Sequence, residues 1–182
     1  MKTNDFWRLI EDAHVKAKGN SEQQYRLIDK QLCDSPASEI IDFETILKEQ
    51  LRRADQFKMM EAALIVASYV SDDTFEDFRA WLISLGKEKF ERALDDPESI
   101  ADLLTREQAL EITGDGLVTA AFMAYKKVTK TEDLYEHVEM QPDPEYPFDW
   151  PETIEQYQAK YPRLFAKLWN QKRINELHPP RN

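Results

Sequence analysis

Ser-Asp-Asp-Thr-Phe-Glu-Asp-Phe-Arg-Ala-Trp-Leu-Ile-Ser-Leu-Gly, residues 71–86, is the most clearly patterned stretch of the sequence. Its large apolar side chains recur in steps of three and four residues, which is the spacing of one face of an amphipathic helix. Gly86 follows the pattern, and a glycine in that place commonly ends a helix. The stretch therefore predicts one helix whose buried stripe comprises Phe75, Phe78, Leu82 and Leu85, with Trp81 beside it.

The start of this predicted helix is rich in residues that cap helices. Ser71–Thr74 offers several capping side chains in succession, and Asp73 with Glu76 has the spacing of a capping box. Together with Asp72 and Asp77, these carboxylates also suit a hard cation. Acidic side chains in a first turn more often cap the helix and complement its dipole. We therefore interpret them as helix caps and expect no metal site.

Arg79 lies on the same predicted helix, between Phe78 and Trp81. A guanidinium in this position either pairs with a carboxylate or binds an anion. We predict a buried polar knot in which Asp72 and Asp73 cap the helix and one of them, or a carboxylate on another helix, pairs with Arg79. The alternative is a ligand pocket around residues 71–81, with these residues and Trp81 as the binding groups.

Helical patterns continue on both sides of this stretch. On the basis of apolar spacing and capping residues we expect helices near residues 5–18, 21–32, 36–51, 59–70, 87–94, 105–112, 117–128, 151–158 and 161–174, and a short turn at 97–103. Residues 64–70 also suit a buried strand, but Ala62, Ala63 and Ala67 favour a closely packed helix. In the third helix, Glu44 with Lys48 has the spacing of an exposed ion pair.

The composition favours a single all-α domain of about seven to nine helices. The chain has 182 residues and only 4 glycines, and 42% of its residues are apolar, enough for a core. Lys and Arg number 24 against 35 Asp and Glu, a net charge of −11, which disfavours nucleic-acid binding. Cys33 is the only cysteine. No apolar run approaches a membrane span or a secretory signal, so we expect a cytoplasmic protein.

A second feature is the acidic segment between Thr131 and Ala159. It holds nine Asp or Glu, four prolines and no Lys or Arg. We divide the chain into a helical body (1–130), an acidic connection (131–159) that is irregular near 130–150, a C-terminal helix (160–174) and a tail (175–182) that frays. Exposed aromatic and acidic side chains suit a protein-binding surface, although the aromatics could instead pin the loop to the body. The candidate partner-binding residues are Asp143, Glu145, Tyr146, Phe148, Asp149 and Trp150.

The residues used by most enzymes are scattered in this sequence. His14, His137 and His178 lack the spacing of metal ligands. The run Gly114-Asp115-Gly116 lacks the third glycine of a dinucleotide fingerprint, and we interpret it as a helix breaker. We therefore expect neither catalytic residues nor a cofactor.

The run at residues 71–86 resembles the signature of DUF4240, a mainly bacterial family of unknown function. Residues 6–10, Phe43 with Leu47, Phe90, residues 93–97 and residues 161–164 are similar in order and spacing. The resemblance covers residues 1 to about 104 and, more loosely, the last helix. Family members often carry a Gly-Gly-Cys-like stretch where this chain has Ser68-Tyr69-Val70. The resemblance implies no activity.

We therefore expect an interaction protein rather than an enzyme. An adaptor, or an inhibitor of a basic partner such as an immunity protein for a basic toxin, would use the acidic surface. The competing hypothesis is an enzyme or small-ligand binder with its pocket around Ser71–Trp81.

Overall fold

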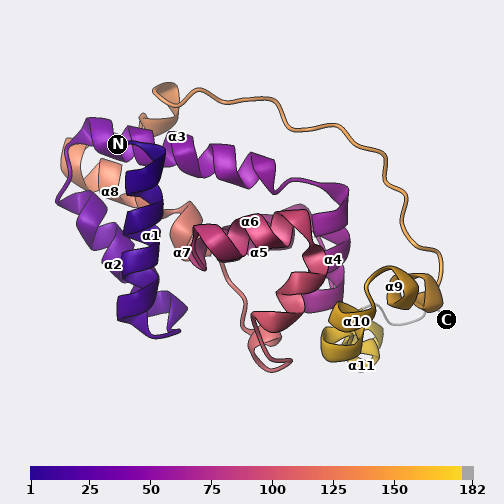
Figure 1. Ribbon diagram of the computed structural model, residues 1–182. Coiled ribbons are helices and arrows are strands. Elements are labelled where there is room, and N and C mark those ends of the chain that lie inside the picture. The colour runs from indigo at the N-terminus through magenta and orange to yellow at the C-terminus, as the bar shows by residue number, and fades with distance from the viewer. Residues whose placement is uncertain (178–182) are drawn as a thin grey trace.

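The computed structural model describes residues 1–177, and its regular structure in that range is entirely helical (Figure 1). This confirms the all-α prediction, but the described residues hold eleven α-helices rather than seven to nine. The predicted fraying of the tail extends to residues 178–182, which lie outside the described residues. The α-helices are α1 (Thr3–Ala17), α2 (Ser21–Cys33), α3 (Ala37–Arg53), α4 (Phe57–Ala67), α5 (Asp72–Ser84), α6 (Lys87–Asp95), α7 (Asp115–Val118), α8 (Ala120–Thr129), α9 (Ile154–Lys160), α10 (Pro162–Leu168) and α11 (Gln171–Leu177).

The central helix α5 forms at the stretch with the clearest pattern. Ser71 is its N-cap: the Ser71 hydroxyl accepts from the Thr74 amide, and the Thr74 hydroxyl accepts from the Ser71 amide at 2.8 Å. The capping box is therefore Ser71 with Thr74, two positions before the predicted pair of Asp73 with Glu76. Helix α5 packs against α1, α3, α4, α6 and α7, which is why its buried face is broad.

Residues 57–67 form helix α4, so the helix prediction for the ambiguous segment is confirmed. The helix ends at Ala67 rather than Val70, because Ser68 adopts the left-handed conformation with φ of 64°. An αL residue at this position commonly ends a helix. The chain then runs through three non-helical residues before Ser71 caps α5.

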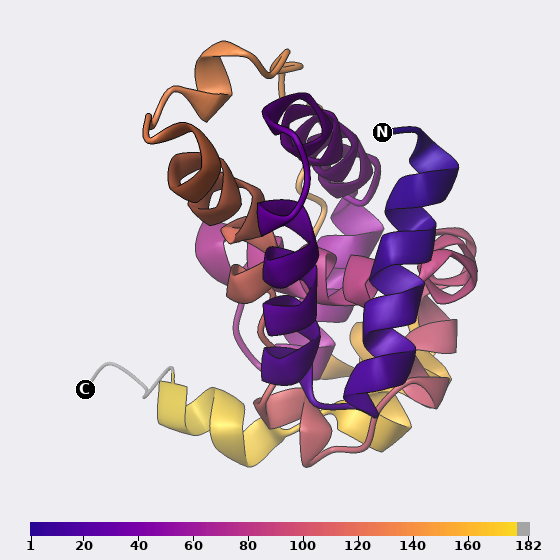
Figure 2. The same ribbon diagram turned by 90° about the vertical axis from the view of Figure 1, so that its left-hand side faces the viewer.

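The helices form two groups on either side of α5. Helix α2 packs against α1 and α8, and α8 also packs against α3 (Figure 2). On the other side, α10 packs against α4 and the 3₁₀ helix η1 (Pro97–Asp102). The largest fully buried side chains come from both groups and include Phe6, Phe43, Phe78, Phe90, Ile28 and Met59.

Three predicted helices have other boundaries. Only Gln108–Leu110 of the predicted helix 105–112 is helical, as the 3₁₀ helix η2. The predicted helix 161–174 is two helices, α10 and α11, because Trp169 between them has an extended ψ of 126°. The first helix starts at Thr3 rather than near residue 5, and no side chain caps it.

Gly114 allows the start of α7 to approach α5 closely. Its amide donates to the Asp77 carboxylate at 3.1 Å, and a Cβ at this position would lie 2.5 Å from the Ala80 Cβ. As predicted, the helical run is interrupted here, since residues 111–114 are not helical, but Gly114 is also the N-cap of α7 and Gly116 lies within that helix. The need for a close approach, rather than a break, explains the glycine at position 114.

The chain between α8 and α9 is mostly irregular. After the short 3₁₀ helix η3 (Leu134–Glu136), residues 139–152 contain neither helix nor strand. We call these residues the strap. In Figure 1 the strap runs as an extended line from the end of α3 that lies near α8 to the C-terminal helices.

In residues 1–177, no helix combines the length and the apolar character needed to cross a membrane.

Candidate binding site at the acidic strap

The strap is attached to the body through one hydroxyl and a group of rings. The Tyr146 hydroxyl donates to Asp55 Oδ1 at 2.6 Å. Around Phe57, at the start of α4, gather the rings of Tyr146, Phe148 and Trp150, with centroid separations of 6.2, 5.9 and 4.9 Å. Aromatic pairs at such separations are mutually attractive. These contacts correspond to the alternative in which the aromatics pin the loop, yet Phe148 remains 64% exposed.

Asp55 also holds Arg79, the arginine of the α5 stretch. The guanidinium lies 3.2 Å from Asp55 Oδ2, donates to the Leu51 and Phe75 carbonyls, and lies 4.4 Å from the centroid of the Phe75 ring. Both side chains of the ion pair are only 14% exposed. Asp55 thus links Arg79 on α5 to Tyr146 on the strap. Burial and the bond to Asp55 raise the pKa of the Tyr146 phenol.

The remaining members of the predicted polar knot lie elsewhere. Asp72 and Asp73 are exposed at the first turn of α5, so the carboxylate that pairs with Arg79 is Asp55 rather than either of them. Trp81 is buried, packs against Phe78 and lines a different pocket near the turn between α1 and α2. The structure therefore does not bring the four predicted residues into one site.

The outer face of the strap is acidic and partly apolar. Met140 is 61% exposed, like Phe148. The strap also presents a row of exposed carboxylates, and none of them forms an ion pair with a residue of the described range 1–177. These carboxylates are Glu139, Asp143, Glu145, Asp149 and Glu152.

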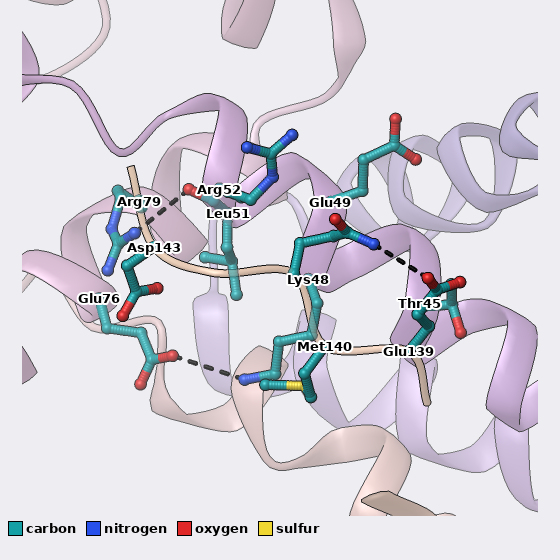
Figure 3. A pocket seen from close by; sticks show the side chains of 11 residues that line it. Thr45, Lys48, Glu49, Leu51, Arg52, Glu76, Arg79, Glu139, Met140 and Asp143 are labelled. Carbon is teal, nitrogen blue, oxygen red and sulfur yellow. Dashed lines mark hydrogen bonds and ion pairs between the residues drawn. The ribbon is translucent and has the colours of Figure 1, made fainter. Parts of the chain in front are cut away.

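A pocket of ≈ 390 Å³ lies between the strap, α3 and α5 (Figure 3). Lys48 and Arg52 of α3, Glu76 and Arg79 of α5, and Met140 and Asp143 of the strap are among the residues that line it. Glu76 and Arg79 belong to the stretch around which the competing hypothesis expects a pocket. In Figure 3 the Asp143 carboxylate points toward that of Glu76, and Glu76 in turn pairs with Lys48 at 3.6 Å.

Glu44, one turn before Lys48 on α3, is fully buried. Neither of its carboxylate oxygens has a hydrogen-bond partner, and the Lys48 ammonium is 3.9 Å away. Burial raises the pKa of Glu44 to about 7, with Lys48 opposing and Glu76 adding to the shift. The prediction of an exposed Glu44–Lys48 pair is therefore wrong about exposure. The spacing in the sequence could not reveal the burial of Glu44, because charged residues at i and i+4 ordinarily face solvent.

A second buried carboxylate, Glu61 of α4, anchors the chain beyond the strap. Lys160 donates to both Glu61 oxygens at 2.7 Å, and the Tyr161 hydroxyl donates at 2.6 Å. Burial and the bond to Glu61 raise the pKa of Tyr161. Because Glu61 and Lys160 are 99 residues apart in the sequence, no local pattern could predict this contact. The chain is thus held against the body in the second half of the strap, at Tyr146 and Trp150, and again just beyond it, at Lys160 and Tyr161.

The described residues hold no candidate metal site. Within residues 1–177, no group of three or more His, Cys, Asp or Glu side chains has the arrangement of a metal site. His137 lies 3.6 Å from Asp133, one turn earlier.

A family model, described as a protein of unknown function (DUF4240), matches residues 1–127. This range includes α5, Arg79 and the floor of the pocket but not the strap. No curated protein and no solved structure matches the chain.

Proposed function

The chain belongs to the DUF4240 family of proteins of unknown function, and from this premise we propose that it is a non-enzymatic interaction protein that binds a basic protein partner through its acidic strap. Two roles fit this proposal: an adaptor, and an inhibitor that neutralises a basic protein such as a toxin. Both require the same contact, a cationic surface against the strap.

One observation carries the proposal. The strap displays five exposed carboxylates, contains no Lys or Arg, and forms no ion pair with residues 1–177, whereas the acidic residues of the body are interspersed with basic ones and some, such as Glu91 and Asp102, pair with arginines. Unpaired exposed charges of one sign attract the opposite charge on a partner and speed the encounter. The exposed Phe148 ring and Met140 side chain add apolar area of the kind that interfaces bury.

The attachment of the strap supports the proposal further. Tyr146 and Trp150 hold the strap against Asp55 and Phe57, so its carboxylates are presented on an ordered backbone. Ordering a flexible loop on binding costs free energy, and a segment that is already held avoids part of that cost. The contacts that pin the loop therefore assist binding rather than replace it.

Variants in which carboxylates are replaced by neutral amides test the proposal. A strap variant removes three carboxylates that make no side-chain contact in the described residues: Glu145→Gln, Asp149→Asn and Glu152→Gln. A control variant of equal charge removes three exposed carboxylates of the body: Asp12→Asn, Glu88→Gln and Glu111→Gln. We expect the immobilised strap variant to retain basic proteins from a cell extract at least tenfold less well than the control. Equal retention by the two variants would refute the proposal.

The pocket beside the strap is the observation that favours a second candidate, a small-ligand binder. Its lining includes Glu76 and Arg79 from the family-matched stretch. Cavities of ≈ 390 Å³ fall within the range of small-molecule sites. A ligand-binding activity that persists in the strap variant would favour this candidate.

A further inference from the structure

We propose that the pocket between the strap, α3 and α5 receives one lysine or arginine side chain of the basic partner, whose charged head lies between Glu76 and Asp143. The inference rests on the proposed function and deepens it, because it names a specific point of recognition within a surface otherwise defined by charge. This point of recognition combines Glu76 of the family-matched region with Asp143 of the strap.

The pocket has the two kinds of wall that a basic side chain needs. Met140 and Leu51 supply apolar surface for an alkyl stem, and long basic side chains bury such stems while keeping the charge near polar groups. Glu76 of α5 and Asp143 of the strap line another part of the pocket; in Figure 3 the Asp143 carboxylate points toward that of Glu76, which is directed at Lys48. The volume of ≈ 390 Å³ is many times the ~30 Å³ share of one water.

The buried carboxylate of Glu44 gives the second, independent sign of a guest. The Lys48 ammonium lies between Glu76 and Glu44, at 3.6 and 3.9 Å, and makes a hydrogen bond to neither. A guest cation that replaces Lys48 at Glu76 frees Lys48 to bond to Glu44, which otherwise has no partner. The exchange gives Glu44 and Glu76 one cation each, and pairing is the condition for burying ions without a large penalty.

This change of the ion-pair partner of Lys48 also makes the affinity for the guest cation depend on pH. The groups that face Glu44 are Lys48 on its own helix, Glu76 on α5 and Tyr135 on η3. Moving Lys48 onto Glu44 favours the ionised carboxylate, whose pKa is about 7. The guest therefore binds more tightly as the pH rises through this value.

Two arginines limit what the pocket accepts. Arg79 is occupied by Asp55 at 3.2 Å and is not free to bind an anion. Arg52, exposed at the rim, forms no ion pair with a residue of the described range. It would repel a cationic guest and attract an anionic one, so its removal separates the two possibilities: Arg52→Gln strengthens binding of a cation and weakens binding of an anion.

The test uses the full chain with methyl-labelled methionines and follows their NMR signals. The probes are N-acetyl-arginine amide, its neutral analogue N-acetyl-citrulline amide, and acetate as an anion. Met140 reports on the pocket, and Met123 on α8, which is similarly exposed at 56%, is the control. We expect a saturable shift of Met140 with the arginine probe alone. Asp143→Asn weakens this binding at least threefold, and Arg52→Gln strengthens it.

A Met140 signal that responds equally to the citrulline or acetate probe, or to none, would overturn the inference. Failure of the inference is distinct from failure of the proposed function. If Met140 does not respond while the strap variant still loses basic proteins, the outer carboxylates bind the partner and the pocket does not. If Met140 responds and the strap variant retains basic proteins normally, the pocket accepts a cation but the strap is not the partner surface.

Discussion

Tyr146 and Arg79 share one carboxylate: Tyr146 donates to Asp55 Oδ1 at 2.6 Å, and Arg79 lies 3.2 Å from Asp55 Oδ2. The first residue belongs to the acidic strap and the second to the central helix of the family-matched region. Asp55 lies in the turn between α3 and α4. A segment outside the family match is thus tied directly to the most characteristic stretch of the family.

Removing the Tyr146 hydroxyl tests the attachment of the strap. We expect Tyr146→Phe to lower the free energy of unfolding by about 1.5 kcal/mol, the low end of the range for hydrogen bonds to charged groups. Tyr135→Phe is the control, because the structure gives that hydroxyl no hydrogen bond. Urea unfolding measures both variants, and an equal effect of the two would show that the bond to Asp55 contributes nothing.

Truncating Arg79 tests whether its ion pair is structural. Arg79→Ala leaves Asp55 half-buried without its cation, which we expect to cost about 3 kcal/mol in unfolding free energy. The exposed Arg8–Asp5 pair, at 3.5 Å, gives the matched control, since Arg8→Ala is expected to change stability by less than about 0.5 kcal/mol. If Arg79→Ala keeps the wild-type melting temperature but loses binding of a partner, Arg79 is a binding residue instead.

Glu44 predicts a decline of stability with increasing pH. Its pKa is about 7 in the folded chain against 4.5 in the unfolded chain, so between these values the folded state holds more protons than the unfolded state. The contribution of Glu44 to stability is therefore fully present below about pH 4.5 and is lost as the pH rises through 7, by about 3 kcal/mol. Glu44→Gln should remove this slope and stabilise the protein at about pH 8. Chemical unfolding at several pH values measures the free energy of unfolding of both proteins. The same dependence of this free energy on pH in the variant and the wild type would contradict the prediction.

The contact of Glu61 with Lys160 and Tyr161 predicts a local rather than global weakness. Glu61→Ala removes the acceptor for both donors. Because Lys160 is 49% exposed and can be solvated, the main cost is the buried Tyr161 hydroxyl left without an acceptor, and we expect the free energy of unfolding to fall by about 1–3 kcal/mol. Hydrogen exchange should rise most in α9 and α10, and least in α1 and α2. The exposed Lys172–Glu176 pair, at 3.8 Å, supplies the control Glu176→Gln. A uniform rise over all helices would show that the contact does not act as a local anchor.

Much of the helical body could be predicted from the sequence. The apolar spacing of Phe75, Phe78 and Leu82 identifies α5 because a helix buried on one broad face must repeat every three to four residues. The alanines of α4 favour a helix over a strand for a different reason: their small side chains let neighbouring helices pack closely. Such signals are local, and local structure follows from them.

The site depended on contacts that no local pattern contains. Tyr146 reaches Asp55 across 91 residues, and Asp55 lies in a turn with no pattern of its own. The lysine four residues after Glu44 predicts that Glu44 faces solvent. Its carboxylate is instead buried, where Glu76 of α5 and Tyr135 of η3 face it. The break at Trp169, where ψ is 126°, contains neither glycine nor proline, so no local signal in the sequence marks it.

The most direct test of the account is the salt dependence of binding between the full chain and a basic protein that it retains. The account predicts that the dissociation constant rises steeply between about 50 and 300 mM salt, because exposed charges are screened over a Debye length of ~10 Å at 0.1 M. It also predicts that Glu145→Gln, Asp149→Asn and Glu152→Gln together flatten this dependence while the body control keeps it. A dissociation constant that does not change with salt, or the same salt dependence in both variants, would contradict recognition by the strap.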